Sequence, residues 1–228
     1  MSQMVLQVVD AGERRVDVNW VFNGGYAGRD QAEVQHHVDE LAKLGVPAPS
    51  RVPSLYPLSN FLLSQGDSTQ VPHNQTSGEA EWALIIADDP SDVYIVGACD
   101  HTDRDLERHG VAWSKQSAPD FLGILAWRWD DIKDDFDNFT LRAWVTNQGR
   151  EEPIQDGSPA QLLSPAYWLD ALTEANLARP GTLLMSGTIP MIPDVNQFAE
   201  AWRVELADHH GNVSRAAYRV EQLAPAWG

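Results

Sequence analysis

Three acidic residues have the types and spacing most able to support chemistry: Glu79, Glu81 and Asp100. In an extended strand, residues i and i+2 point to the same face, so Glu79 and Glu81 project side by side. Asp100 ends the next apolar segment along the chain. Neighbouring carboxylates repel one another unless a proton or a cation lies between them. An all-oxygen set of ligands suits Mg²⁺ or Mn²⁺, and the spacing does not choose between the two.

The segments that carry these carboxylates are typical of two buried β-strands. Residues 79–86 and 93–100 flank a cluster of turn-forming residues at 87–92. A Glu-x-Glu pair on a strand is more often a solvated face than a metal site. The apolar runs at 84–86 and 94–96 favour the metal site, because they place the carboxylates at the mouth of a core.

Two histidines could supply a general base. Asp30 and Glu33 resemble a capping pair that starts a helix, and His36 and His37 follow on it. A histidine with an acidic residue at i+3, as in His36 with Asp39 or His37 with Glu40, can be oriented to accept a proton. A surface histidine pair is the more common outcome of this spacing.

Two later segments could contact an anionic substrate. Lys115 follows the acidic cluster; a lone lysine is usually solvated, but one held near a cation and an anion could stabilise an enolate. Ser186, Gly187 and Thr188 come directly after an apolar segment, where hydroxyls and free backbone N–H groups can hold a carboxylate. Ordinary turn chemistry explains this second segment equally well.

Composition limits the classes of protein that the chain can belong to. With 228 residues, 43% of them hydrophobic, it can bury a core within one domain. The net charge of −17 argues against nucleic acid and anionic membranes as partners. Cys99 is the only cysteine, no apolar leader is evident, and no segment approaches the ~20 apolar residues of a membrane span. A cytoplasmic protein is expected.

Strands outnumber helices in the remaining pattern, which predicts a mostly β member of the α+β class. A hairpin is expected from residues 5–9 and 15–21, a Gly-rich turn at 23–30, and an irregular proline-rich segment at 47–57. Further strands are expected at 139–145, 202–207 and 216–223, and a helix at 164–178.

The motifs together resemble the fumarylacetoacetate hydrolase superfamily. That family has a Glu-x-Glu pair, a strand ending Asn-Asp-Val-(Ser/Thr)-x-Arg-Asp, a lysine segment that ends in proline, and a Pro-Gly-Asp…Thr-Gly-Thr-Pro segment. Here they appear in the same order as 79–81, 99–105, 115–119 and 180–190. The chain departs from the pattern at Cys99, which replaces the asparagine, and at His101, which replaces an aliphatic residue. A divergent branch is therefore expected.

The resemblance implies a mixed β-sandwich roll, a catalytic domain at 25–228 preceded by a strand extension at 1–24, and a homodimer. It also implies roles for individual residues. Glu79, Glu81 and Asp100 would hold Mg²⁺ or Mn²⁺; Arg104, Lys115 and Thr188 would contact the substrate; and His37, oriented by Glu40, would activate water, with His36 as the alternative.

The implied function is metal-dependent hydrolysis of a C–C bond in a 2-oxo or 1,3-dicarbonyl acid of the acylpyruvate type. Decarboxylation, hydration or isomerisation of a related oxo acid would use the same metal site. A non-catalytic metal-bound module on the same fold is the alternative from another class. The sequence does not identify the substrate.

Overall fold

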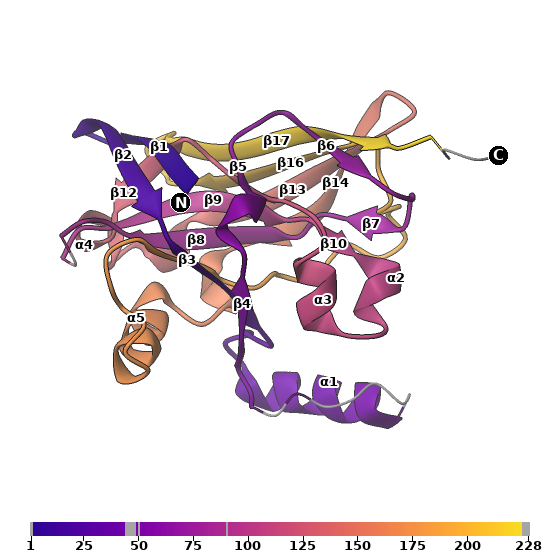
Figure 1. Cartoon of the computed structure of the whole chain (residues 1–228), viewed down its shortest axis with the longest axis horizontal. Helices are drawn as coiled ribbons and strands as arrows, with labels where there is room; N and C mark the ends of the chain where they lie inside the picture. Colours follow the sequence, from indigo (N-terminus) through magenta and orange to yellow (C-terminus); the bar gives the residue numbers. More distant parts are fainter. Residues whose placement is uncertain (1, 44–48, 50, 90, 225–228) are drawn as a thin grey trace.

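The computed structural model describes residues 2–43, 49, 51–89 and 91–224, with the backbone alone for residues 37 and 40–43. Two β-sheets form the body, and most of the helices lie along one side of it (Figure 1). The larger sheet follows the order β2-β1-β12-β9-β8-β15-β3-β4, and β11 pairs with β9 and β5. The smaller one follows β14-β13-β16-β17-β6. No helix among these residues is long and apolar enough to cross a membrane.

The strands of the larger sheet are short. They are β1 (Ser2–Val8), β2 (Gly12–Val18), β3 (Trp20–Gly25), β4 (Ser54–Leu58), β5 (Leu63–Ser64), β8 (Ala80–Ile86), β9 (Val93–Asp100), β11 (Asp120–Leu122), β12 (Leu125–Arg128) and β15 (Thr182–Met185). Parallel pairs, such as β3 with β15, occur beside antiparallel ones, so the sheet is mixed.

The smaller sheet contains β6 (Ser68–Val71), β13 (Thr140–Asn147), β14 (Arg150–Gly157), β16 (Ala201–Ala207) and β17 (Val213–Gln222). Its inner face packs on β8 and β9, and Trp82 and Trp202 are among the large side chains buried between the two layers. Gly97 on β9 is required there, because a Cβ atom would lie 2.5 Å from the Ser214 carbonyl oxygen. The alternation along β16 follows from this packing, since every second side chain faces the core.

In the described part of the chain, the remaining elements are a two-stranded ladder, five helices and three short 3₁₀ segments. The ladder joins β7 (Thr76–Ser77) to β10 (Thr102–Asp103). The helices are α1 (Gln31–Lys43), α2 (Arg104–Glu107), α3 (Val111–Lys115), α4 (Trp129–Ile132) and α5 (Pro165–Glu174), and the 3₁₀ segments are η1 (Asn60–Leu62), η2 (Phe136–Asn138) and η3 (Pro159–Gln161).

The predicted mostly β class and the central strand pair are confirmed, and two local predictions are wrong. Residues 23–25 belong to strand β3 rather than to a turn, because β3 is paired on both sides, by β15 and β4. Residues 54–58 form β4 instead of an irregular segment. The predicted extension at 1–24 contributes β1 and β2 to the larger sheet, where β1 also pairs with β12. The division at residue 24 stays a prediction.

Candidate metal centre

Strand register brings the three acidic residues together. Ala80 pairs with Cys99 across β8 and β9, so Glu79 lies opposite Asp100 at the end of β9, and Glu81 lies two residues further along β8 on the same face. The Asp100 N–H donates to the Glu79 carbonyl oxygen at 3.1 Å. Each residue offers a carboxylate oxygen, and these oxygens all lie within 4.8 Å of one another. Side chains placed in this way could hold one divalent cation.

Two basic side chains compensate this buried negative charge. Lys115 is only 5% exposed, and its Nζ donates to Asp100 Oδ2 and to Glu79 Oε2, the latter at 3.1 Å. Arg104 Nη1 lies 2.9 Å from Glu79 Oε1 and also pairs with Glu107. A lone lysine is usually solvated, but Lys115 is buried and ion-paired. Helices α2 and α3 carry both cations to the carboxylates.

The carboxyl groups of the cluster differ in their affinity for protons. Burial opposes ionisation of Glu79, but Lys115 and Arg104 lower its pKa to about 2. Burial raises the pKa of Glu81 well above its ordinary value, and Asp100 and Glu79 add to the effect. The pKa of Asp100 is also raised, first by burial and then by Glu79. A divalent cation would displace the protons that these groups retain.

Two residues that sequence reasoning missed complete the cluster. Asn23 on β3 donates from Nδ2 to Asp100 Oδ2 at 3.2 Å and to Glu81 Oε2 at 3.3 Å. Asp120 on β11 is the strand partner of Asp100 and is fully buried. No N–H or hydroxyl group of the described residues donates to its oxygens, and burial, followed by Asp100 and Glu81, raises its pKa well above the ordinary value.

No local signal in the sequence could have identified either residue. Asn23 precedes two glycines in a segment that resembles a turn, and Asp120 is one of many acidic residues. Only the pairing of β3 with β15 and of β11 with β9 brings them to the carboxylates.

Thr188 lies beside the cluster but uses its hydroxyl internally. Its Oγ1 donates to the Ala80 carbonyl oxygen at 2.9 Å and accepts from Gln155 Nε2 at 2.9 Å. The preceding Gly187, at a φ of +82°, donates its N–H to Glu81 Oε2 at 2.9 Å. The segment predicted to hold a substrate carboxylate therefore orients Glu81, and the substrate contact stays a prediction.

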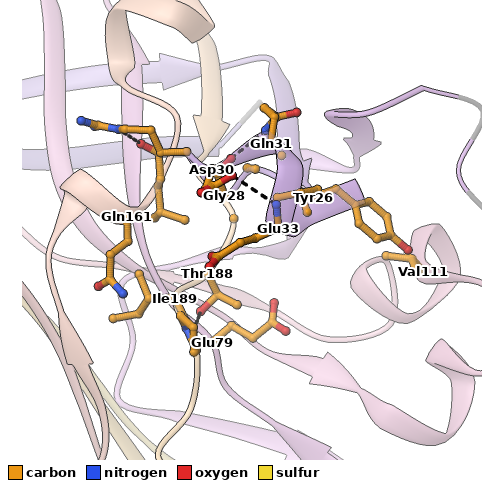
Figure 2. A pocket seen from close by; sticks show the side chains of 18 of the residues that line it. Tyr26, Gly28, Asp30, Gln31, Glu33, Glu79, Val111, Gln161, Thr188 and Ile189 are labelled. Carbon is orange, nitrogen blue, oxygen red and sulfur yellow. Dashed lines mark hydrogen bonds between the residues drawn. The ribbon is translucent and has the colours of Figure 1, made fainter. Parts of the chain in front are cut away.

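A cleft of about 1180 Å³ opens over this centre (Figure 2). Glu79, Lys115 and Thr188 line the cleft. It is also lined by Tyr26, from the segment that leads into α1, and by Glu33, from the first turn of α1. Asp30 caps α1 as predicted, because its Oδ1 accepts from the N–H groups of Ala32 and Glu33. His37 and Glu40 fall on α1, but their side chains lie outside the described residues.

Behind Asp100, a buried hydrogen-bond chain occupies the positions where the sequence departs from the family pattern. The His101 ring bonds through Nδ1 to the Tyr218 hydroxyl at 2.8 Å and through Nε2 to Thr76 Oγ1 at 3.0 Å. The Tyr218 hydroxyl also lies 3.2 Å from Cys99 Sγ. This chain joins β9 to β17 of the smaller sheet and fixes the backbone on either side of Asp100.

The fold is that of the fumarylacetoacetate hydrolase superfamily, as the motifs predicted. A 2-keto-3-deoxy-D-arabinonate dehydratase complexed with magnesium and 2,5-dioxopentanoate has a TM-score of 0.64 and 17% identity, covering 94% of this chain and 78% of that one. A yeast fumarylacetoacetate hydrolase family protein gives a TM-score of 0.55 and 14% identity, covering 92% and 96%.

A third structure with this fold is the maleylpyruvate hydrolase from Sphingobium sp. SYK-6 in complex with manganese(II) and pyruvate. Its TM-score is 0.56 at 14% identity, covering 91% of this chain and 72% of that one.

By sequence, the chain belongs to the family described as protein of unknown function DUF2848, whose family model matches residues 24–218. No curated protein is significantly similar in sequence. Membership of a separate family with this fold agrees with the divergent branch that Cys99 and His101 indicated.

His101 should make the stability of the protein depend on pH. Burial, and then the charge of Arg104, lower its pKa to about 4, while Asp103 opposes the shift. Because the folded-state pKa lies below the ~6.5 of an unfolded histidine, the stabilisation is complete above pH 6.5 and is lost as the pH falls toward 4. Between pH 7.0 and 5.5 we expect His101 to cost about 1 kcal/mol of unfolding free energy.

Urea unfolding of the wild type and of His101→Asn at these two pH values measures this effect. The variant should show the smaller loss. Equal losses in the two proteins would mean that His101 is not held neutral by its surroundings.

Proposed function

We propose that the protein is a divalent-metal-dependent enzyme that hydrolyses a C–C bond in a 2-oxo or 1,3-dicarbonyl acid of the acylpyruvate type. The observation that carries this proposal is the buried cluster of Glu79, Glu81 and Asp100, which adjoins a large cleft through Glu79. Bound there, Mg²⁺ or Mn²⁺ would act as a Lewis acid toward the oxygens of the oxo acid. Two structures with this fold, the dehydratase and the maleylpyruvate hydrolase, hold magnesium or manganese together with an oxo compound.

The residues of the chain provide the groups that such a substrate needs. Lys115 lines the cleft and can donate to a substrate carboxylate or enolate oxygen, because its ammonium group has three hydrogens and two carboxylate partners. We assign the contact from Thr188 to its backbone N–H, since its hydroxyl hydrogen is directed at Ala80. Arg104 acts in this proposal mainly through Glu79, whose ionised form it stabilises.

A dehydration, decarboxylation or isomerisation of a related oxo acid is the second candidate, and the dehydratase with this fold favours it. The test is a screen of acylpyruvates, oxaloacetate and sugar-derived 2-oxo acids with Mg²⁺ and Mn²⁺, with products identified by mass. Cleavage of an acylpyruvate supports the hydrolase, and loss of water or CO₂ supports the second candidate. Absence of turnover with tight metal binding would support a non-catalytic module. The homodimer and the cytoplasmic location stay predictions.

Metal binding should depend on Glu81. A ligand present at one hundred times its Kd stabilises a folded protein by about 2.7 kcal/mol, so Mn²⁺ should raise the Tm of the wild type. Glu81→Gln resembles the protonated Glu81 that burial favours, so its Tm without metal should be close to that of the wild type. Its shift with Mn²⁺ should be lost.

Glu174→Gln is the matched control, because Glu174 is exposed on α5. This control should keep the full Mn²⁺ shift. A wild type without heat of Mn²⁺ or Mg²⁺ binding, or a full shift in Glu81→Gln, would refute the metal site.

Lys115→Met should separate the lysine from the metal site. Removing the ammonium group takes a competing cation away from Asp100 and Glu79, so Mn²⁺ affinity should be unchanged or higher. Turnover should fall by about 10²-fold, as expected for loss of one electrostatic donor. Lys133→Met is the control, because Lys133 is an exposed residue paired only with Asp130 among the described residues. Unchanged kcat and KM in Lys115→Met would contradict the placement of the substrate.

The general base stays a prediction from the sequence. If His37 accepts the proton of water, His37→Ala should reduce kcat by ~10²–10⁴-fold and leave Mn²⁺ affinity intact. The paired variant His36→Ala should then be active. The opposite pattern would move the role to His36, and full activity in both variants would remove α1 from the chemistry.

A further inference from the structure

Asn23 contacts two of the proposed metal ligands from a strand that is not adjacent to either. It lies on β3, which β15 separates from β8. The Asn23 side chain is completely buried, and its Nδ2 lies 3.3 and 3.4 Å from the two Glu81 oxygens and 3.2 Å from Asp100 Oδ2. A single amide therefore touches both carboxylates at once.

The other end of the same amide is unsatisfied. Asn23 Oδ1 is buried and has no hydrogen-bond partner among the residues that the structure describes. A buried oxygen without a donor is uncommon in folded proteins, since its lost hydration is not replaced. Most buried amides use both ends, as Gln155 does here by accepting from the Ala80 N–H and donating to Ile189. Because Oδ1 accepts no hydrogen bond, a half-turn of the Asn23 amide would break no bond at that end.

The distances around Asn23 match the spacing of ligands around a small cation. Mg²⁺ binds oxygens octahedrally at 2.0–2.1 Å, so neighbouring ligands of one ion lie ~3.0 Å apart. The Asn23 terminal atom that faces the carboxylates lies 3.2 to 3.4 Å from oxygens of Glu81 and Asp100, close to that edge length. Rotation of the amide by half a turn exchanges its NH₂ group and its oxygen at this position.

We propose that Asn23 is a fourth protein ligand of the cation and binds it through Oδ1. Without a cation, the NH₂ end faces the carboxylates because they are acceptors. With a cation between Glu81 and Asp100, the oxygen end is the favoured one. A neutral ligand adds an oxygen without adding a negative charge to a cluster that already contains buried carboxylates. The inference rests on the metal-binding part of the proposed function and is independent of the substrate.

This assignment changes the number of positions left for other ligands. One oxygen from each of Glu79, Glu81 and Asp100 would leave three positions of an octahedral ion, whereas Asn23 reduces them to two. A 2-oxo acid fills two positions when it chelates an ion through its keto oxygen and one carboxylate oxygen. A substrate held by both oxygens would then leave no position for a metal-bound water, so the water for hydrolysis would have to be held by side chains.

Mn²⁺ titration calorimetry, together with electron–nuclear double resonance in H₂¹⁷O, tests the proposal in the wild type and two variants. The wild type should bind Mn²⁺ with two exchangeable waters. Asn23→Leu should bind it ~10–100-fold more weakly, the loss typical of disturbed metal shells, and with three waters. The control is Asn60→Leu, which removes an amide that donates to the Val18 carbonyl oxygen and does not line the cleft. It should match the wild type in both measurements.

The possible results separate this inference from the proposed function. Three Mn²⁺-bound waters in the wild type would overturn the inference about Asn23, and that measurement does not require any variant to fold. Weaker Mn²⁺ binding by Asn23→Leu with an unchanged number of waters would mean that Asn23 positions the ligands without binding the ion. This result would also overturn the inference. Asn23→Asp, which retains an oxygen, should keep two waters. A wild type that binds no Mn²⁺ would instead refute the metal site itself, and this inference with it.

Discussion

The structure depends on the compensation of negative charge at one buried place. Glu79, Glu81 and Asp100 are each at most 8% exposed, and burial of unpaired carboxylates is strongly unfavourable. The chain after β9 meets this requirement by turning into α2 and α3, which return Arg104 and Lys115 to the cluster. The first segment after the acidic strand therefore supplies its counter-charges.

Strand register determines which groups can take part in that compensation. β8 and β9 place the acidic residues together, and β11 adds Asp120 because it pairs with β9. The Gly187 N–H reaches Glu81 from the end of β15, where a Cβ atom on Gly187 would lie 2.6 Å from the Gly24 carbonyl oxygen. The smaller sheet supports the same place from behind, through Tyr218 and His101. Because the carboxylates and the Gly187 N–H lie at or next to strand ends, the geometry of the acidic cluster is set by backbone pairing, and only its cations come from helices.

The sequence predicted the parts of this arrangement that are local and missed those that are not. Apolar runs and a short turn predicted the two strands that carry the carboxylates, and both strands are confirmed. The order of motifs indicated the fold but could not show that Lys115 is ion-paired with Asp100. Asn23 resembled part of a glycine-rich turn because the partner strand β15 is far away in sequence. The same reason explains why the sequence did not predict strand β4, which pairs with β3 although α1 separates the two strands in sequence.

The means of compensation also explain how the protein can fold before a metal is bound. In small zinc domains the metal supplies most of the folding free energy, since their ligands have no other partners. Here Glu79 is ionised against Lys115 and Arg104, while burial raises the pKa values of Glu81 and Asp120 well above their ordinary values and so favours protons on these groups. The cluster is therefore balanced by side chains and protons, and its carboxylates already lie within reach of one ion. A divalent cation would replace protons in a site whose sheets and helices are formed, so metal binding is not required for the fold to form.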